Sequence, residues 1–243
     1  MLPWTELDRV PLPGGGVLRL MRRGQEFSIK LGVAELMTSR LFGSEEALAT
    51  LAAQRFRGRK DPRILIGGLG MGFTLRAALA AFGPGARIVV AELVASVVDW
   101  ARGPMAELFG ACLDDPRLEL AIADVAALIR APKPLYDIIL LDVDNGPEGM
   151  TQLANDGLYS TRGLRSARTA LRPGGVLAVW SQGPDAAFAQ RFEKAGFVVE
   201  EKRVRAGGVH GGSRHVIWLG AREERGDIGA PTSTPIRGDR QGR

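Results

Sequence analysis

Residues 64–74 of the chain read ILIGGLGMGFT. Three apolar residues that favour strands lead into a loop in which four of the six residues 67–72 are glycine, and a helix-forming segment follows. A strand, a glycine loop and a helix in this order are typical of turns that hold a phosphate or a nucleoside. The spacing of Gly68, Gly70 and Gly72 is GxGxG, which lacks the last glycine of the dinucleotide fingerprint GxGxxG. We favour a ligand loop, and a plain turn between strand and helix stays open as the alternative.

Strand and helix patterns alternate on the C-terminal side of this loop. Expected strands cover residues 63–67, 86–92, 117–124, 136–144, 174–181, 197–204 and 213–220. Expected helices cover residues 73–82, 95–110 with a break at Gly103-Pro104, 125–130, 158–171 and 185–196. The alternation predicts an α/β fold with a doubly wound, mostly parallel sheet of seven strands. No helical pattern separates the last two strands, which favours an antiparallel closing pair.

The N-terminal side of the loop has a different pattern. Residues 1–16 are rich in Pro and Gly and are expected to be irregular. Residues 17–23 and 26–31 flank Gly24-Gln25 as a β-hairpin, and residues 34–40 add a third strand. Residues 44–56 form an amphipathic helix, which Ser44 is expected to cap and whose dipole Glu45 and Glu46 favour.

Composition and charge restrict the class of protein. The chain of 243 residues contains one cysteine, Cys112, which excludes an internal disulfide framework and favours a reducing cytoplasm. No apolar run is long enough for a membrane span, and no signal peptide precedes the first strand. The net charge of +5 invites a nucleic-acid hypothesis, but scattered basic residues and an aromatic content of 6% argue against it. A basic surface or an acidic substrate explains the charge better.

Acidic residues stand where several of the expected strands end. Glu92 closes the second strand, 20 residues beyond Gly72, where a carboxylate can accept both hydroxyls of a ribose. Asp124 ends the third strand, from which it could reach an adenine amino group. Asp142 and Asp144 end the most apolar strand, and residues two apart share a face. A carboxylate there can orient an attacking amine and take its proton, or it can simply cap the turn at Asn145-Gly146.

Other kinds of chemistry find little support. His210 and His215 lack neighbours at metal-ligand spacing, so no metal site is expected. Ser181 lies outside a GxSxG motif and Cys112 has no recognisable base, which argues against nucleophilic catalysis. The sequence contains no GxxxxGK[ST] loop, which argues against ATP hydrolysis.

Taken in order, these segments resemble the spermidine synthase family of aminopropyltransferases, a branch of the S-adenosylmethionine-dependent methyltransferase fold. The resemblance runs from about Arg63 to Glu200 and rests on the strings LIGGLGMGFTLRAAL, VVAELVASVVDWAR, DDPRLELAIADVAALI, YDIILLDVDNGP and ANDGLYSTRGLRSARTALRPGGVLAVW. It implies transfer of an aminopropyl group from decarboxylated S-adenosylmethionine to an amine such as putrescine, without a metal.

The resemblance also implies roles for individual residues. The donor is expected to contact the glycine loop and two strand ends, namely Gly67, Gly68, Gly70, Gly72, Glu92, Leu93, Asp124 and Val125. Glu92 would hold the ribose and Asp124 the adenine side, while Asp142, with Asp144 beside it, would orient and deprotonate the amine. We expect a strand-rich region with a helix at 1–60, an S-adenosyl-binding Rossmann-like domain at 61–221 and a disordered tail at 222–243. A homodimer is the assembly that the family resemblance implies.

Three positions differ from the family pattern. Gly70 stands where the family places an acid that binds the amine of the donor, Asn145 replaces the second acid of a D-x-x-D motif, and a Tyr-His-Glu segment is not recognisable in residues 39–52. Two rivals therefore stay open: a methyltransferase that uses intact S-adenosylmethionine, and a nucleoside-binding module without catalysis.

Overall fold

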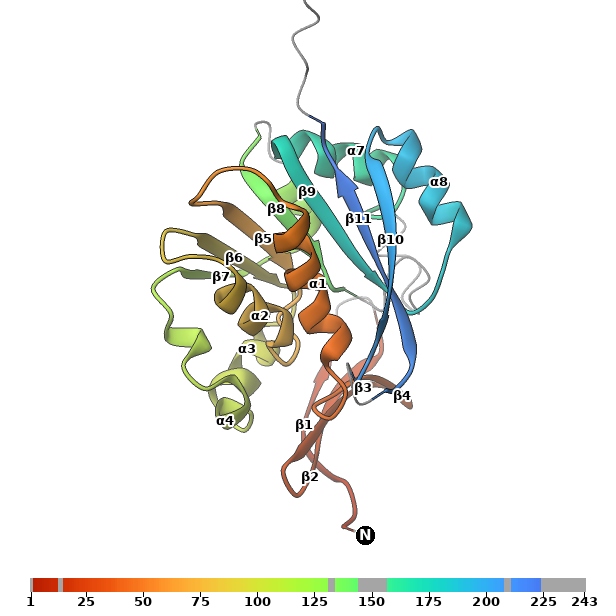
Figure 1. Cartoon of the computed structure of the whole chain (residues 1–243). Helices are drawn as coiled ribbons and strands as arrows, with labels where there is room; N and C mark the ends of the chain where they lie inside the picture. The colour runs from red at the N-terminus through yellow and green to blue at the C-terminus, as the bar shows by residue number, and fades with distance from the viewer. Residues whose placement is uncertain (1, 13–14, 131–133, 144–156, 208–210, 224–243) are drawn as a thin grey trace, which may run out of the picture.

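The computed structural model describes residues 2–12, 15–130, 134–143, 157–207 and 211–223. These residues form a small antiparallel sheet followed by a larger, mostly parallel sheet with helices on both faces (Figure 1). No helix in this part of the chain is long and apolar enough to cross a membrane.

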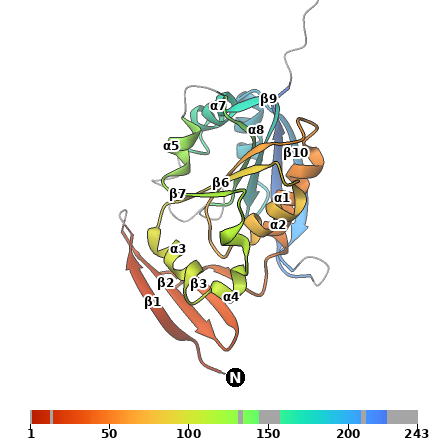
Figure 2. The same ribbon diagram turned by 90° about the vertical axis from the view of Figure 1, so that its left-hand side faces the viewer.

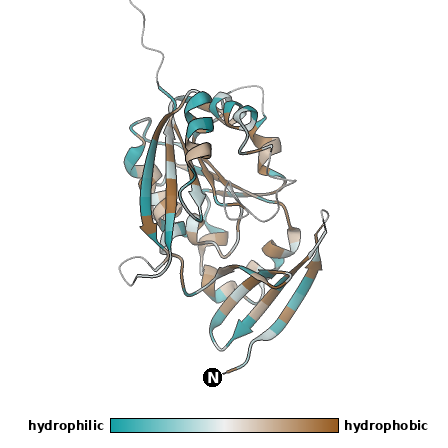
Figure 3. Ribbon diagram, turned by 90° about the vertical axis from the view of Figure 1, so that its right-hand side faces the viewer, coloured by the Kyte–Doolittle hydropathy of each residue, from teal (hydrophilic) through white to brown (hydrophobic). Residues whose placement is uncertain are grey.

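The N-terminal sheet contains four antiparallel strands in the order β1-β2-β3-β4. Their bounds are Thr5–Pro11 for β1, Val17–Arg23 for β2, Glu26–Leu31 for β3 and Ala34–Thr38 for β4. The strands carry alternating bands of hydrophilic and hydrophobic residues (Figure 3), because one face packs inward and the other meets water. The hairpin and the third strand are confirmed, while β1 lies in a stretch expected to be irregular. Its mostly exposed, polar residues and the register shift between Glu6 and Asp8 hide the alternation of a strand.

The large sheet has seven strands in the order β10-β11-β9-β8-β5-β6-β7. Their bounds are Arg63–Gly67 for β5, Arg87–Glu92 for β6, Leu118–Ile122 for β7, Tyr136–Leu141 for β8, Leu171–Ser181 for β9, Val198–Arg205 for β10 and Arg214–Ala221 for β11. Strands β5 to β9 pair in parallel, and β11 runs antiparallel to both β9 and β10. Every residue of the central strand β8 is buried, as expected of a strand covered on both faces. The predicted fold class is confirmed.

Helices cover the two faces of this sheet and divide the core in two (Figures 1 and 2). The first face carries α1 (Gly43–Arg55), α2 (Phe73–Ala81), α3 (Ala95–Arg102) and α4 (Ala106–Phe109). The second face carries α5 (Val125–Ile129), α7 (Thr161–Ala170) and α8 (Ala186–Lys194). A short 3-10 turn, Cys112–Asp114, leads into β7. The predicted break between α3 and α4 is confirmed.

The small sheet shares its core with the first face of the large one. Leu20 and Ile29 are buried in the same cluster as Ile64 and Leu75, and the indole Nε1 of Trp100 on α3 donates to Asp8 Oδ2 at 2.7 Å. Figure 2 shows α3 and α4 beside the strands of the small sheet. The N-terminal region therefore packs directly against the elements that surround the glycine loop.

Helix α1 packs against α2, β9 and β11, so it belongs structurally to the helices of the large sheet. Its N-cap is Phe42, which makes no side-chain cap, and the prediction that Ser44 caps the helix is wrong. Ser44 lies inside the first turn instead, where its hydroxyl group donates to Glu45 Oε2 at 2.6 Å. The division of the chain at residue 60 stays a prediction.

Two strands end earlier than their apolar patterns suggested. Strand β7 ends at Ile122, since the carboxylate of Asp124 accepts the N–H of Ala126 at 2.8 Å and caps α5. Strand β8 ends at Leu141, which leaves Asp142 in the loop that follows. Asp144 and the expected tail from residue 224 onward lie outside the described residues.

Candidate active site

The glycine loop, Glu92 and Asp142 meet at one edge of the large sheet. Strands β5, β6 and β8 run parallel, so their carboxyl ends lie together, which is where open α/β sheets bind ligands. Two backbone hydrogen bonds hold the ends in register: Gly68 N–H donates to Ala91 O at 2.8 Å, and Asp142 N–H donates to Gly67 O at 3.2 Å. The strand-end residues selected from the sequence are thus neighbours in space.

Glu92 is a buried carboxylate that ties the glycine loop to β6. It is 7% exposed; Oε2 accepts the N–H of Leu69 at 2.9 Å and Oε1 accepts the N–H of Val94 at 2.8 Å. Burial raises the pKa of Glu92, and the backbone donors around it oppose that rise. A carboxylate has about four lone-pair sites. Four backbone N–H groups act on these sites, those of Leu69, Gly70, Leu93 and Val94, so donors from the glycine loop and from the end of β6 surround the carboxylate.

The protein itself requires the glycines of the loop. Gly68 has a φ of 87°, and a Cβ atom there would lie 2.7 Å from the carbonyl oxygen of Asp142. Gly72 has a φ of 78°, and a Cβ atom would overlap the ring of Phe109. Packing around the loop explains these glycines without a ligand. The case for a ligand loop therefore rests on Glu92 and on the location at the sheet edge.

Residue 70 touches the small sheet. A Cβ atom at Gly70 would lie 2.8 Å from Cε of Met37 on β4, and the φ of Gly70 is 50°. The position where the family pattern has an acid is therefore covered by a thioether from the N-terminal sheet. Both the contact with Met37 and the positive φ favour glycine at position 70.

The other residues expected to bind the donor lie close to the same edge. Leu93 follows Glu92 and is 62% exposed, so its side chain is free to cover an apolar ring. Asp124 uses one carboxylate oxygen to cap α5, and its other oxygen lies 3.9 Å from Arg130 Nη2. Val125 is buried against Gly67, so only its backbone could reach a ligand. Their assigned roles stay predictions.

Asp142 is half-buried and is held by one strong hydrogen bond. Thr74, in the first turn of α2, donates its hydroxyl proton to Asp142 Oδ2 at 2.8 Å. Burial raises the pKa of Asp142 to about 6, because the ionised form loses hydration, and the Thr74 hydroxyl group opposes the rise. A carboxyl group with such a pKa can exchange a proton near neutral pH.

The structure brings a second carboxyl group, Glu45, to Asp142. Glu45 is 8% exposed, and Thr74 Oγ1 lies 3.3 Å from its carbonyl oxygen. Burial, and then the charge of Asp142, raise the pKa of Glu45 to about 7. Sequence reasoning treated Glu45 as a helix-dipole residue and missed its position beside Asp142. The only available signal was a Glu at the start of an amphipathic helix, which is common on protein surfaces.

Behind Glu45 stands a histidine from β11. The hydroxyl oxygen of Ser44 lies 2.6 Å from Glu45 Oε2 and 2.9 Å from His215 Nδ1. The ring of His215 packs edge-on to Trp180, with centroids 4.7 Å apart. His210 lies outside the described residues, and the described part of the chain holds no group of three potential metal ligands.

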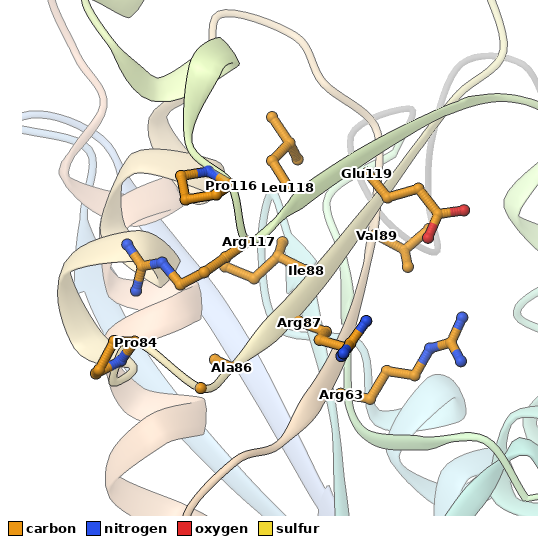
Figure 4. A pocket seen from close by; sticks show the side chains of 11 residues that line it. Arg63, Pro84, Ala86, Arg87, Ile88, Val89, Pro116, Arg117, Leu118 and Glu119 are labelled. Atoms are coloured by element: carbon orange, nitrogen blue, oxygen red, sulfur yellow. The ribbon is translucent and has the colours of Figure 1, made fainter.

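A separate hollow of about 380 Å³ opens at the opposite edge of the sheet (Figure 4). It is lined by the amino ends of β5, β6 and β7, including Arg63, Arg87 and Glu119. Arg117 on its rim is occupied by Asp115 and the carbonyl oxygen of Phe82. None of the strand-end carboxylates at the opposite edge lines it, so it plays no part in the site above.

Comparison with known proteins agrees with this geometry. Residues 42–190 match the Spermine/spermidine synthase domain. The chain belongs to the spermine/spermidine synthase family. The match covers α1, the glycine loop and Asp142, and it confirms the resemblance drawn from the sequence motifs.

The relatives cover the chain in part. A polyamine aminopropyltransferase of Nitrosomonas europaea is 38% identical over 98 residues, 40% of this chain and 29% of the relative. Polyamine aminopropyltransferase 2 of Pseudomonas aeruginosa is 35% identical over 124 residues, 49% of this chain and 33% of the relative. These matches therefore span about a third of each relative's length.

Solved structures share the fold. The spermidine synthase of Thermotoga maritima superposes with a TM-score of 0.71 at 18% identity, covering 89% of this chain and 72% of the other. A spermidine synthase in complex with the transition-state analogue AdoDATO gives the same figures. The seven-stranded architecture behind a small antiparallel sheet is thus that of spermidine synthases.

Proposed function

We propose that the protein is an aminopropyltransferase, which moves an aminopropyl group from decarboxylated S-adenosylmethionine to a small amine such as putrescine. The observation that carries this proposal is the carboxyl pair Asp142 and Glu45 beside the glycine loop that Glu92 holds. Membership of the family supports the same reaction.

Each residue has a task that its contacts make possible. Glu92, at the edge of the glycine loop, accepts the ribose hydroxyls, and the exposed Leu93 covers one face of the adenine. Asp124 and the backbone of Val125 lie on the adenine side, while Gly68 and Gly70 line the loop under the nucleoside. These assignments place the sulfonium between Glu92 and Asp142.

The reaction is a displacement at the carbon next to the sulfonium. The nitrogen of the acceptor forms a bond to that carbon as the carbon–sulfur bond breaks, and the sulfonium leaves as a neutral thioether. The amine must lose a proton to attack, and Asp142 orients it and accepts that proton. Holding the amine in line with the carbon–sulfur bond supplies much of the acceleration. Asp144 lies outside the described residues, and its part in the reaction stays a prediction.

The charge of the site favours the decarboxylated donor. Asp142 and Glu45 attract ammonium groups, which both the aminopropyl tail and a diamine carry, and they repel the carboxylate of intact S-adenosylmethionine. Met37, which is uncharged, faces Gly70 and offers that carboxylate no partner. This argument places the methyltransferase alternative second. A homodimer and a location in the cytoplasm stay predictions.

Calorimetric titration with the two donors tests the proposal. Decarboxylated S-adenosylmethionine is expected to bind at least tenfold more tightly than the intact donor, a difference of about 1.4 kcal/mol. The protein is then incubated with the decarboxylated donor and putrescine, and the aminopropylated product is measured by mass spectrometry. Preference for the intact donor would support the methyltransferase instead, and failure to bind either would support a module without this chemistry.

A further inference from the structure

Three side chains form a continuous hydrogen-bonded chain that leads away from the carboxyl pair. Glu45 and Ser44 come from the first turn of α1, and His215 comes from the second residue of β11. The Ser44 hydroxyl oxygen is 2.6 Å from Glu45 Oε2 and 2.9 Å from His215 Nδ1. Both distances lie within the range of ordinary hydrogen bonds.

The surroundings hold this chain in place. Ser44 is fully buried, and the N–H of Gly43 donates to the carbonyl oxygen of Ala206 at 2.6 Å, which ties the start of α1 to the end of β10. Trp180 supports the ring of His215 from one side. The three groups are therefore fixed by backbone contacts and packing rather than by one another alone.

The single hydroxyl proton of Ser44 couples the protonation state of Glu45 to the tautomer of His215. A serine hydroxyl group carries one proton, so it donates to only one neighbour and accepts from the other. When Glu45 is ionised, Ser44 donates to it and must accept a proton from Nδ1 of His215. When Glu45 is protonated, Ser44 accepts from Glu45 and donates to Nδ1, and the imidazole then carries its proton on Nε2. The protonation of Glu45 thus selects the tautomer of His215.

The two ends of this hydrogen-bonded chain differ in how readily they hold a proton. Burial raises the pKa of Glu45, and the charges that add to the rise are those of Asp142, in the loop after β8, and of Glu46 on α1. His215 is half-buried and partly accessible to water, and burial lowers its pKa. Glu45 therefore gains a proton readily near neutral pH, while an imidazolium at His215 loses one readily.

We propose that Glu45, Ser44 and His215 form a proton relay that carries the proton of the acceptor amine from the carboxyl pair to solvent. This inference rests on the proposed function and adds a catalytic partner for Asp142 and two positioning residues. The nearest alternative is a purely structural role for the chain, in which it only anchors α1 to β11.

The proton balance of the relay is simple. The N–H bond of the amine breaks as Asp142 gains the proton, and the Asp142 O–H bond then breaks as the proton passes to Glu45. Protonated Glu45 selects the Nε2 tautomer of His215, which the ring reaches by losing its Nδ1 proton to water and taking a proton from water at Nε2. The Glu45 O–H bond then breaks as Ser44 gains that proton, and the original hydroxyl proton of Ser44 forms a bond to Nδ1 of His215. The resulting imidazolium releases its Nε2 proton to water. Glu45 is left ionised, and no electron is transferred.

Two substitutions separate a relay from an anchor. Ser44→Ala removes the hydroxyl group, whereas His215→Asn places an amide at the position of Nδ1, so that a hydrogen bond to Ser44 survives but a titrating group does not. With decarboxylated S-adenosylmethionine and putrescine as substrates, both variants are expected to lose about tenfold in kcat at neutral pH, less than the full effect of a general base. Donor affinity is expected to stay unchanged, and added imidazole is expected to restore part of the rate of His215→Asn.

A matched control lies in the small sheet. Ser28 is also fully buried, and its hydroxyl group donates to Glu35 Oε2 at 2.6 Å. Ser28→Ala removes an equivalent Ser–Glu hydrogen bond and is expected to leave kcat and its pH profile unchanged. Wild-type kcat and pH profile in His215→Asn would overturn the relay and leave only the anchor.

A second measurement tests the relay without turnover. The chain contains two histidines, so ¹⁵N labelling of histidine gives two sets of ring signals. On acidification, His215 is expected to move from the Nδ1 to the Nε2 tautomer before its ring gains a second proton, and Glu45→Gln is expected to abolish that step. The same tautomer shift of His215 in Glu45→Gln as in the wild type would overturn the relay. Absence of product from the wild-type protein would instead refute the proposed reaction, whatever the NMR result.

Discussion

Replacing Glu45 by glutamine is expected to make the folded protein more stable at pH 8 and to change its stability at pH 5 by no more than about 1 kcal/mol. Glutamine has the same shape and can still accept the Ser44 hydroxyl proton, but it carries no charge. Burial and the neighbouring Asp142 raise the pKa of Glu45 from 4.5 to about 7. This difference corresponds to about 3 kcal/mol at about 1.4 kcal/mol per pKa unit.

The sign follows from proton linkage. Between pH 4.5 and 7 the folded state binds more protons at Glu45 than the unfolded state, so the free energy of unfolding falls as the pH rises. The cost is absent well below the unfolded pKa and complete above about pH 7. Glu45→Gln removes it, and the gain at pH 8 is expected to approach about 3 kcal/mol. A site whose ionised carboxyl group lowers stability is a common cost of function.

Urea unfolding followed by tryptophan fluorescence at pH 5, 6, 7 and 8 measures this difference. Asp142 contributes its own fall in stability, mainly between pH 4 and 6, in both proteins. The matched control is Glu46→Gln on the next residue, whose half-exposed ion pair with Arg76 is worth at most about 1 kcal/mol. Parallel curves for wild type and Glu45→Gln between pH 5 and 8 would refute the reasoning.

Three further outcomes are expected. Asp142→Asn keeps the shape of the site but cannot accept a proton, so turnover is expected to fall by about 100-fold or more while calorimetry shows donor affinity within about twofold; unchanged turnover would remove Asp142 from the mechanism. Gly70→Ala is expected to cost about 1–3 kcal/mol of unfolding free energy, since φ is positive and Met37 fills the space, and adding Met37→Ala is expected to recover only the part due to contact; a neutral Gly70→Ala would contradict this packing. Asp137→Ala is expected to cost about 2–4 kcal/mol, because the buried carboxylate accepts the N–H of Arg63 at 2.8 Å and pairs with Arg172 at 2.7 Å; thermal melting within 1 °C of the wild type would show that this cluster is dispensable.

The strand ends illustrate how far sequence reasoning reaches. Alternating apolar strands and helices predict a parallel sheet, and parallel strands bring their carboxyl ends together. The neighbourhood of the glycine loop, Glu92 and Asp142 follows from that rule alone, and the structure confirms it. The reason for the glycines does not follow, because the carbonyl oxygen of Asp142 and the ring of Phe109 approach the loop from other elements.

Helix α1 illustrates where sequence reasoning stops. Its pattern predicts a helix, and the structure confirms one, but the pattern does not say which part of the protein the helix packs against. A glutamate in the first turn of a helix is usually explained by the helix dipole, and a serine before it by a cap. Neither explanation requires a partner from β11, 171 residues away along the chain.

The sequence by itself therefore determined the order of the elements after β1, the sheet type and the sheet edge at which the strand-end acids gather, because these depend on local periodicity and on the general geometry of parallel sheets. Only the tertiary structure decided that Glu45 stands beside Asp142, that Ser44 bonds to His215 and that Met37 covers Gly70. The physical reason is that these contacts arise from the docking of α1, β4 and β11 around the sheet edge. Docking buries apolar faces from distant parts of the chain together, and no short stretch of sequence records which faces will meet.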